Sequence, residues 1–276
     1  MAHNQIGLRV HNLKASYGTR RKKSVPVLKG ASFEAMRGTI TVVVGSSGAG
    51  KSTLISCVAG LQPIENGEIS FAVDGGLRKI VCDRRRSLST SERRFIGVCF
   101  QQSHLWSHMT VRENLVHPQV WLKKTPKEVA EDRANALLAS LRLDAQANSQ
   151  VTQLSGGQRQ RVAILRALAV EPEVLLLDEI TASQDPANVQ SIFGIVKAYV
   201  KESGCTVLTI SHDMQFVRKI ADVVHLIQGG EIVETCTHRE LAIGNVGHRM
   251  AEFTKAFEEQ REELREHEHS FADPRL

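Results

Sequence analysis

The chain has 276 residues, of which 42% are hydrophobic and 24% are charged, enough to bury one full core with a small subdomain, although the length would also allow two domains. Its net charge of +5 could suit nucleic acid or an anionic membrane surface, but aromatic residues make up only 5% of the chain, so no stacking platform for single strands is evident and no nucleic-acid partner is expected. No stretch approaches the roughly 18 continuous apolar residues of a membrane span, and no secretory leader is recognisable, so we expect a cytosolic protein.

Two basic clusters supply much of the charge, at 20–23 and at 84–86 with Arg93 and Arg94. Neither is interleaved with aromatic residues, so solvated loops are the favoured interpretation and contact with lipid headgroups is the alternative. The five cysteines are scattered, odd in number and without Cys-x-x-Cys spacing. They are expected to be reduced packing residues.

The first predicted elements are short strands within 8–35 and 67–80, separated by glycine and charged turns. They indicate an antiparallel β subdomain. Between them, the β-branched run 40–44 predicts a buried parallel strand, and a helical stretch begins near Lys51.

A phosphate-binding loop joins that strand to that helix. The pattern G-x-x-x-x-G-K-[ST] is matched by Gly45, Ser46, Ser47, Gly48, Ala49, Gly50, Lys51, Ser52 and Thr53. The glycines let the backbone turn and present N–H groups to a β-phosphate, and Lys51 adds a positive charge for the β and γ oxygens. We expect Ser52 to coordinate Mg²⁺ and Thr53 to bond the α-phosphate. A plain glycine turn is the disfavoured alternative.

A helical subdomain is predicted at about 103–165. Apolar residues recur at helical spacing from Ala130 to Leu141, and Thr125 to Glu128 form a plausible helix start. At its far end a Ser-Gly-Gly turn opens a helix and offers a second set of backbone donors for phosphate. This segment includes Ser155, Gly156, Gly157 and Gln158.

An acidic pair follows the apolar run 174–177, which predicts a buried strand. Asp178 is expected to hold Mg²⁺, and Glu179 is placed to act as general base toward an attacking water. Taken alone, such a pair could equally be helix caps or surface charges. Further strands are predicted at 96–100, 206–210 and 223–227, alternating with helices, which indicates a mainly parallel α/β core sheet.

Together these motifs make the chain resemble the ATP-binding cassette (ABC) family, the ATPase subunits of ABC transporters, from about residue 8 to residue 234. The segment Leu154 to Gln158 is similar to that family's signature, which GTPases and kinases lack. The resemblance implies an α/β fold: a P-loop NTPase core with a mainly parallel sheet, an antiparallel β subdomain and a helical signature subdomain. It also implies an ABC ATPase domain over 1–240 and a C-terminal helical extension over 241–276.

Four single residues match further family motifs. The resemblance implies that Tyr17 stacks on adenine, that Gln101 senses the metal and the attacking water, that Asp185 lies in a loop crossing the dimer interface, and that His212 contacts the γ-phosphate. Each has a plainer alternative when considered alone: Tyr17 as a strand aromatic, Gln101 as a polar strand end, His212 as a helix cap. Their joint order around two phosphate motifs favours the functional interpretation.

The implied chemistry is ATP hydrolysis with Mg²⁺, in which Glu179, His212 and Gln101 act in catalysis and Ser52, Gln101 and Asp178 surround the metal. In this family the signature of one subunit covers ATP bound to the phosphate loop of another. The chain has one copy of each motif, so a second ABC subunit, most simply an identical one, is expected.

The implied partners are transmembrane permease subunits and an extracytoplasmic solute-binding protein, with the chain on the cytoplasmic face of the membrane. Runs at 108–114 and 211–214 look like the ATPases of bacterial uptake systems for polar amino acids. The alternatives are an exporter or lipoprotein-release ATPase and, less favoured, a soluble non-transport ABC ATPase. Ile180 to Gln184 and Val151 depart from the family pattern, and Gln184 leads us to expect a dimer weaker than in relatives.

After about residue 240, the apolar residues Met250, Phe253, Phe257 and Leu264 share one stripe at helical spacing. This predicts a terminal helix docked on its own subunit. The alternative is pairing across a dimer in coiled-coil fashion.

Overall fold

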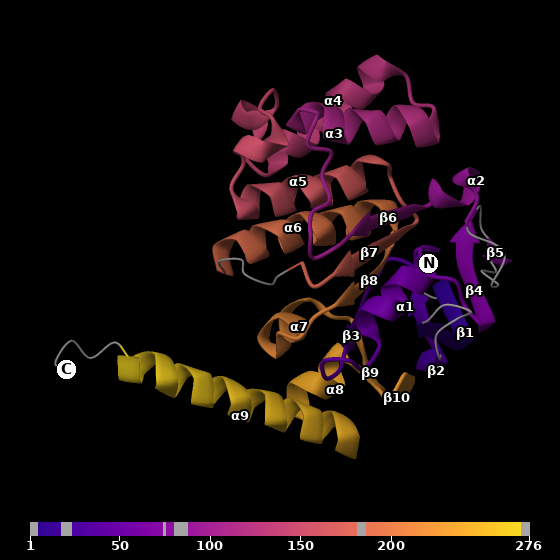
Figure 1. Cartoon of the computed structure of the whole chain (residues 1–276), viewed down its shortest axis with the longest axis vertical. Coiled ribbons are helices and arrows are strands. Elements are labelled where there is room, and N and C mark those ends of the chain that lie inside the picture. The colour runs from indigo at the N-terminus through magenta and orange to yellow at the C-terminus, as the bar shows by residue number, and fades with distance from the viewer. Residues whose placement is uncertain (1–4, 18–23, 74–75, 80–87, 181–185, 272–276) are drawn as a thin grey trace.

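The computed structural model describes residues 5–17, 24–73, 76–79, 88–180 and 186–271, with side chains outside that description at 77–79, 90, 186–187 and 260–271. Within these limits the chain forms two sheets and a separate layer of helices (Figure 1). This arrangement confirms the predicted α/β class.

The core sheet has six strands in the order β10-β9-β3-β8-β7-β6. All neighbours are parallel except β10, which runs antiparallel to β9. The strands are β3 (Ile40–Val44), β6 (Ile96–Cys99), β7 (Val174–Asp178), β8 (Thr206–Ile210), β9 (Val223–Gln228) and β10 (Glu231–Thr237). Every residue of β3, β7 and β8 is buried, as expected for largely apolar runs covered on both faces. The predicted mainly parallel sheet is confirmed.

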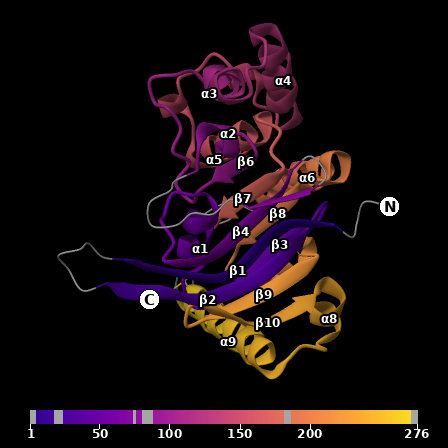
Figure 2. The same ribbon diagram turned by 90° about the vertical axis from the view of Figure 1, so that its right-hand side faces the viewer.

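The second sheet is antiparallel, in the order β2-β1-β4-β5. Its strands are β1 (Ile6–Tyr17), β2 (Val25–Met36), β4 (Asn66–Val73) and β5 (Gly76–Lys79). The expectation of short strands is wrong for β1 and β2, which have 12 residues each, with several register shifts that let a long hairpin twist. Figure 2 shows this hairpin running beside the core sheet.

The helices cover the core sheet and build the separate layer. They are α1 (Lys51–Val58), α2 (Thr90–Arg93), α3 (Val111–Pro118), α4 (Lys127–Ser140), α5 (Gly156–Ala169), α6 (Pro186–Ser203), α7 (Met214–Ile220), α8 (His238–Ile243) and α9 (His248–Phe271). A π-helical turn at Gln119–Lys123 and 3₁₀ turns at Asp144–Gln146 and Val151–Gln153 complete the set. In Figure 1, α3, α4 and α5 lie above the core sheet, and their apolar faces form a hydrophobic cluster of their own.

Helix α9 begins by packing on its own subunit. Met250 is fully buried, and Phe253 and Phe257 pack against the hydrophobic cluster that the core strands form with α5, α6 and α7. Arg218 of α7 forms an ion pair with Glu258 at 2.8 Å. The docking expected for this stripe is therefore confirmed for its first three residues, whereas the side chain of Leu264 lies outside the described part.

Cys57, Cys99, Cys205 and Cys236 are buried, as expected for packing residues, and Cys82 lies outside the described residues. In the described part of the chain, no helix is both long and apolar enough to cross a lipid bilayer.

Candidate nucleotide-binding site

The phosphate loop follows β3 and leads into α1, and its shape depends on glycine. Gly48 and Gly50 have φ values of 77° and 104°, in the left-handed region that side chains disfavour. A Cβ atom at Gly45 would collide with the carbonyl oxygen of Ile227 in β9. The other loop residues divide by exposure: Ser46 and Ser47 are exposed, whereas Ala49 and Thr53 are buried.

Lys51 lies folded back over this loop. Its Nζ donates hydrogen bonds to the carbonyl oxygens of Gly45 at 2.9 Å and Ser46 at 3.0 Å. Burial lowers the pKa of Lys51 from its ordinary value, and the carboxylates of Glu179 and Asp178 oppose that effect. The loop therefore holds a partly desolvated positive charge where phosphate oxygens are expected.

Ser52 and Asp178 bring two oxygen atoms together beside Lys51. The Ser52 hydroxyl donates to Oδ1 of Asp178 at 3.3 Å, at the carboxyl end of β7. Burial raises the pKa of Asp178, and the hydrogen bond from Ser52 acts in the opposite direction. A hydroxyl and a carboxylate are the hard oxygen donors that Mg²⁺ takes in phosphate sites, so this pair fits the metal.

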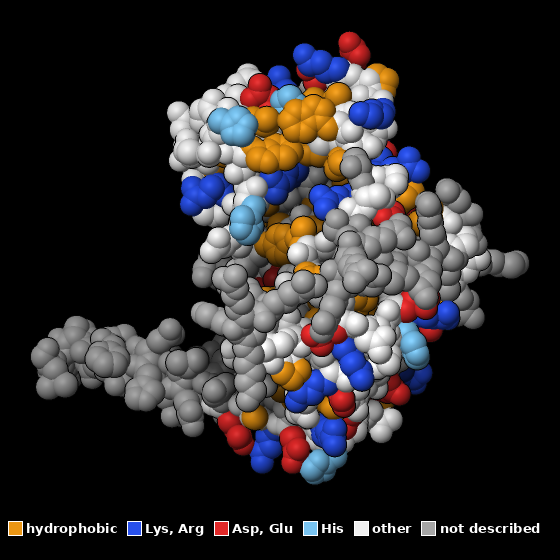
Figure 3. Space-filling view, turned by 45° about the vertical axis from the view of Figure 1, so that its right-hand side comes forward, with side chains coloured by type: hydrophobic (Ala, Val, Ile, Leu, Met, Phe, Trp, Pro, Cys, Tyr) orange, Lys and Arg blue, Asp and Glu red, His pale blue; other side chains and the backbone are white. Residues whose placement is uncertain are grey.

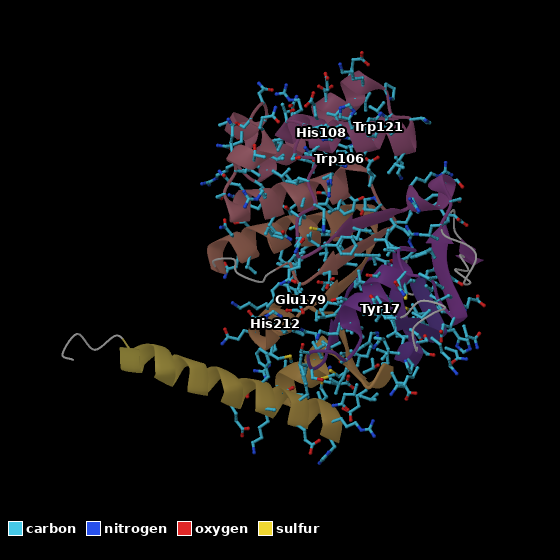
Figure 4. All side chains as sticks on the ribbon, in the orientation of Figure 1. Tyr17, Trp106, His108, Trp121, Glu179 and His212 are labelled. Carbon is cyan, nitrogen blue, oxygen red and sulfur yellow. The ribbon has the colours of Figure 1, made fainter. Side chains whose placement is uncertain are left out.

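Glu179 leaves β7 with φ of 47°, an uncommon backbone conformation for a residue with a side chain. Its N–H donates to the carbonyl oxygen of Ile210 in β8, and its Oε1 lies 3.7 Å from Nδ1 of His212 (Figure 4). The alternative of His212 as a helix cap is wrong, because Asp213 accepts the first-turn N–H groups of α7. The two side chains converge at one edge of the sheet.

Tyr17 ends β1 and is 49% exposed. It pairs in register with Val25 of β2, and two residues further along, the Cγ1 of Val27 lies 3.3 Å from where a Cβ of Gly50 would be. An exposed aromatic ring therefore lies on the strand pair that contacts the phosphate loop, and it is available for stacking.

Gln101 follows β6, whose last residue Cys99 pairs with Leu177 of β7. This register brings Gln101 to the same edge of the sheet as the acidic pair. Gln101 also lines an open groove of about 740 Å³ together with Gly156 and Gly157. The segment after β6 thus lies between the sheet edge and the signature of its own chain.

The signature forms the start of α5. The Ser155 hydroxyl accepts from the N–H of Gln158 at 3.2 Å, and the Gln158 side chain accepts from the N–H of Ser155 at 2.9 Å, a capping box. Ser155 and Gly156 are exposed, and apart from the chain neighbours and the nearby helix backbone, no described atom lies within 4 Å of where a Cβ of Gly156 would be. The signature therefore forms a capped helix start whose first residues are exposed to solvent.

Some expected residues cannot be placed, and others had not been anticipated. Asp185 and Gln184 lie outside the described residues. Sequence analysis missed Gln160 and Arg166 of α5, which hold the segment around Gln101. The sequence pattern that could have revealed them is the presence of polar side chains among the apolar residues of the helix that begins at the signature.

The family profile described as ABC transporter matches residues 28–182, more than half of the chain. The chain belongs to the ABC transporter family. As a member, it is an ATP-hydrolysing subunit.

Individual ABC relatives match most of the chain. The glutamate/aspartate import ATP-binding protein GltL of Escherichia coli (strain K12) is 41% identical over 208 residues, which are 75% of this chain and 83% of GltL. The arginine transport ATP-binding protein ArtM of Bacillus subtilis (strain 168) is 34% identical over 246 residues, 89% of this chain and 98% of ArtM. Among solved structures, the dimeric post-hydrolysis state of the ATP-binding cassette MJ0796 with ADP and Pi has a TM-score of 0.73 at 29% identity, covering 84% of this chain and 99% of that one.

Proposed function

We propose that this chain powers the uptake of polar amino acids as the nucleotide-binding subunit of an ABC importer, working as a dimer that closes on ATP. The single observation that carries the ATPase part is the convergence of Lys51, Ser52, Asp178, Glu179 and His212 on one sheet edge. The solute class rests on relatives whose names describe glutamate/aspartate import and arginine transport.

In this proposal the phosphate loop binds the β- and γ-phosphates. When ATP binds, Lys51 replaces its two hydrogen bonds to loop carbonyls with bonds to phosphate oxygens. Its position over the loop allows this change. Ser52 and Asp178, with Gln101 from the neighbouring strand end, hold Mg²⁺, which neutralises charge on the phosphates when bound. Adenine stacks on the exposed ring of Tyr17.

Glu179 acts as the general base. Its carboxylate is 22% exposed, so it can reach a water molecule, and its turn is fixed by the bond to Ile210. His212, 53% exposed and 3.7 Å away, orients the Glu179 carboxylate and contacts the γ-phosphate. The bound water loses its proton to Glu179 as it attacks the γ-phosphorus in line with the leaving oxygen.

The second half of the site comes from another copy of the chain. Ser155 and Gly156 at the start of α5 are exposed, and no acid occupies the first turn of the helix. A helix N-terminus of this kind stabilises phosphate charge. In the closed dimer the signature of one copy covers the γ-phosphate held by the other, with Asp185 crossing between them.

The partners in this proposal are permease subunits in the membrane and a solute-binding protein on its far side, with the chain bound peripherally at the cytoplasmic face. The test uses tagged Glu179→Gln protein in its native host, with membranes solubilised mildly in the presence of ATP. We expect a polytopic permease to co-purify, and deletion of its gene to abolish uptake of labelled glutamate, aspartate or arginine. Recovery without any permease would contradict the transport role.

A further inference from the structure

Residues 100–106, here called the connecting segment, run from β6 to the helical layer and contain Gln101. Side chains of α5 hold this segment at two points. The Nε2 of Gln160 donates to the carbonyl oxygen of Phe100 at 3.3 Å. The Nη2 and Nη1 of Arg166 donate to the carbonyl oxygens of Ser103 at 3.2 Å and His104 at 2.9 Å. The helix that begins with the signature therefore bonds the backbone both before and after Gln101.

The Arg166 guanidinium also contacts the next part of the segment. It lies 5.4 Å from the ring centroid of Trp106, a cation–π distance. The side chain of Asn114 in α3 accepts from the N–H of Trp106 at 2.9 Å and donates to its carbonyl oxygen at 3.2 Å. Trp106 is thus fixed by its backbone on one side and by its ring on the other.

A surface lies directly beyond Trp106. Its ring centroid is 5.8 Å from that of Trp121, which is 51% exposed, and Figure 4 shows the two side chains next to one another. In Figure 3, hydrophobic side chains gather over this helical layer. A continuous set of contacts therefore leads from the surface at Trp121 through Trp106 to Arg166 and the connecting segment.

The connecting segment also holds an unfavourable backbone conformation. His104 has φ of 44°, in the left-handed region, and its ring packs edge-on against Phe100 at 5.8 Å. Such a conformation persists only where neighbours hold it, and here Arg166 bonds the carbonyl oxygen of that residue. Because the planar guanidinium presents several donors in a fixed fork, it can bond two successive carbonyls and face a ring at once, which a lysine ammonium cannot do.

We propose that Arg166 is a positioning residue: it fixes the connecting segment, and Gln101 within it, to the signature helix α5. The inference rests on the proposed function for the role of Gln101. Beyond that role, the inference identifies the contact that joins Gln101 to the signature helix. Contiguity alone does not demonstrate coupling, so the test measures coupling directly.

The experiment compares Arg166→Lys with Arg161→Lys in the full chain. Arg161 is a matched control because it lies on the same helix and donates to a carbonyl outside the connecting segment, that of Leu141. We expect Arg166→Lys to lower kcat about tenfold, as small misplacements of catalytic groups do, and to leave the Kd for ATP within about twofold. Arg161→Lys should leave both constants unchanged.

A double-mutant cycle with Gln101→Ala separates positioning from general support. If Arg166 acts through Gln101, the double variant should be no slower than Gln101→Ala alone. Hydrogen exchange gives a second readout: amides of 101–106 should exchange faster in Arg166→Lys, while those of 45–53 stay as in the wild type. Losses that multiply in the cycle, or unchanged exchange at 101–106, would overturn the proposal.

The proposal can still be tested if Arg166→Lys does not fold or if the wild-type chain is inactive. If Arg166→Lys fails to fold, Trp106→Leu, which removes the ring from the guanidinium and keeps both carbonyl bonds, should give the same changes at a smaller size. If the wild-type chain neither binds nor hydrolyses ATP, the proposed function fails. The exchange experiment then still decides whether Arg166 holds the segment.

Discussion

The two halves of the proposed nucleotide site differ in how completely this chain builds them. In the phosphate-loop half, Lys51 and Asp178 are each only 7% exposed, and both already have hydrogen-bond partners within the chain. In the signature half, Ser155 and Gly156 are exposed, and the side chain of Ser155 is bonded within the capping box of α5. One half is embedded in the core, and the other is presented for a second molecule.

This contrast has a physical basis. A buried charge must be matched inside the fold, so the phosphate-loop half is tied to the strands around it. A helix N-terminus can stay solvated until an anion arrives, so the signature half costs the free chain little. We therefore expect changes in the first half to affect binding and folding, and changes in the second to affect only closure.

The largest expected effect comes from Glu179→Gln. Loss of the general base should lower kcat about 1,000-fold while the Kd for ATP stays within about threefold, because the amide keeps the shape and removes only the proton acceptor. Steady-state phosphate release and equilibrium ATP binding measure the two quantities. Turnover near the wild-type rate would show that another group is the base.

Lys51→Ala should weaken ATP binding about 100-fold, since it removes a buried, hydrogen-bonded charge from the phosphate loop. Calorimetric titration with ATP checks this. Lys123→Ala is the matched control, because burial also lowers the pKa of Lys123 but this lysine bonds the carbonyl oxygen of Glu171, far along the chain from the loop. Equal losses of ATP affinity in both variants would show that Lys51 has no specific role in binding phosphate.

Much of this site follows from the sequence, and the reasons are local. The run of β3 is short and entirely β-branched, so it predicts a buried strand, and the loop after it needs glycine at fixed positions. The capping box of Ser155 and Gln158 is likewise a short-range pattern. These features depend on neighbours within a few residues.

Other features depend on tertiary contacts that no local pattern encodes. The left-handed φ of Glu179 is set by its bond to Ile210 in the next strand, and the grip of Arg166 on His104 joins residues 62 positions apart. The length of β1 also escaped prediction, because its register shifts become possible only once β2 and β4 are paired with it.

A matched pair of glycine substitutions sharpens the comparison of the two halves. Gly45→Val should destabilise the fold by about 3 kcal/mol, because its Cβ would collide with the backbone of Ile227. Gly156→Val meets open space in the described structure and should leave the free energy of unfolding unchanged while preventing ATP-driven dimers. Urea unfolding and light scattering of both variants measure these outcomes; equal destabilisation would contradict the contrast.

Acid should weaken the phosphate-loop half first, because His225 of β9 is buried beside it, pairing in register with Val43. Burial lowers the pKa of His225 to about 4 from its ordinary 6.5, and hydrogen bonding of the ring to the backbone of Glu34 partly opposes this effect. As the pH falls from 6.5 towards 4, the unfolded chain takes up this proton first, so stability decreases through that window.

From pH 7 to pH 5 this histidine should cost the wild type about 2 kcal/mol that His225→Gln does not lose. Urea unfolding at both pH values measures the difference. His248→Gln serves as the control, since His248 is exposed on α9. An unchanged pH dependence in His225→Gln would show that the buried ring does not control acid stability.

The most direct test of the account is to mix two inactive variants, Lys51→Ala and Gly156→Val. In a mixed dimer, the phosphate loop of the Gly156→Val chain faces the signature of the Lys51→Ala chain, which leaves one intact site. Only mixed dimers hold an intact site, so the mixture should recover ATPase activity up to about half of the wild-type rate, because each mixed dimer has one intact site of two. Recovery of this size is the predicted result, and a mixture as inactive as its components would contradict a site shared between two copies.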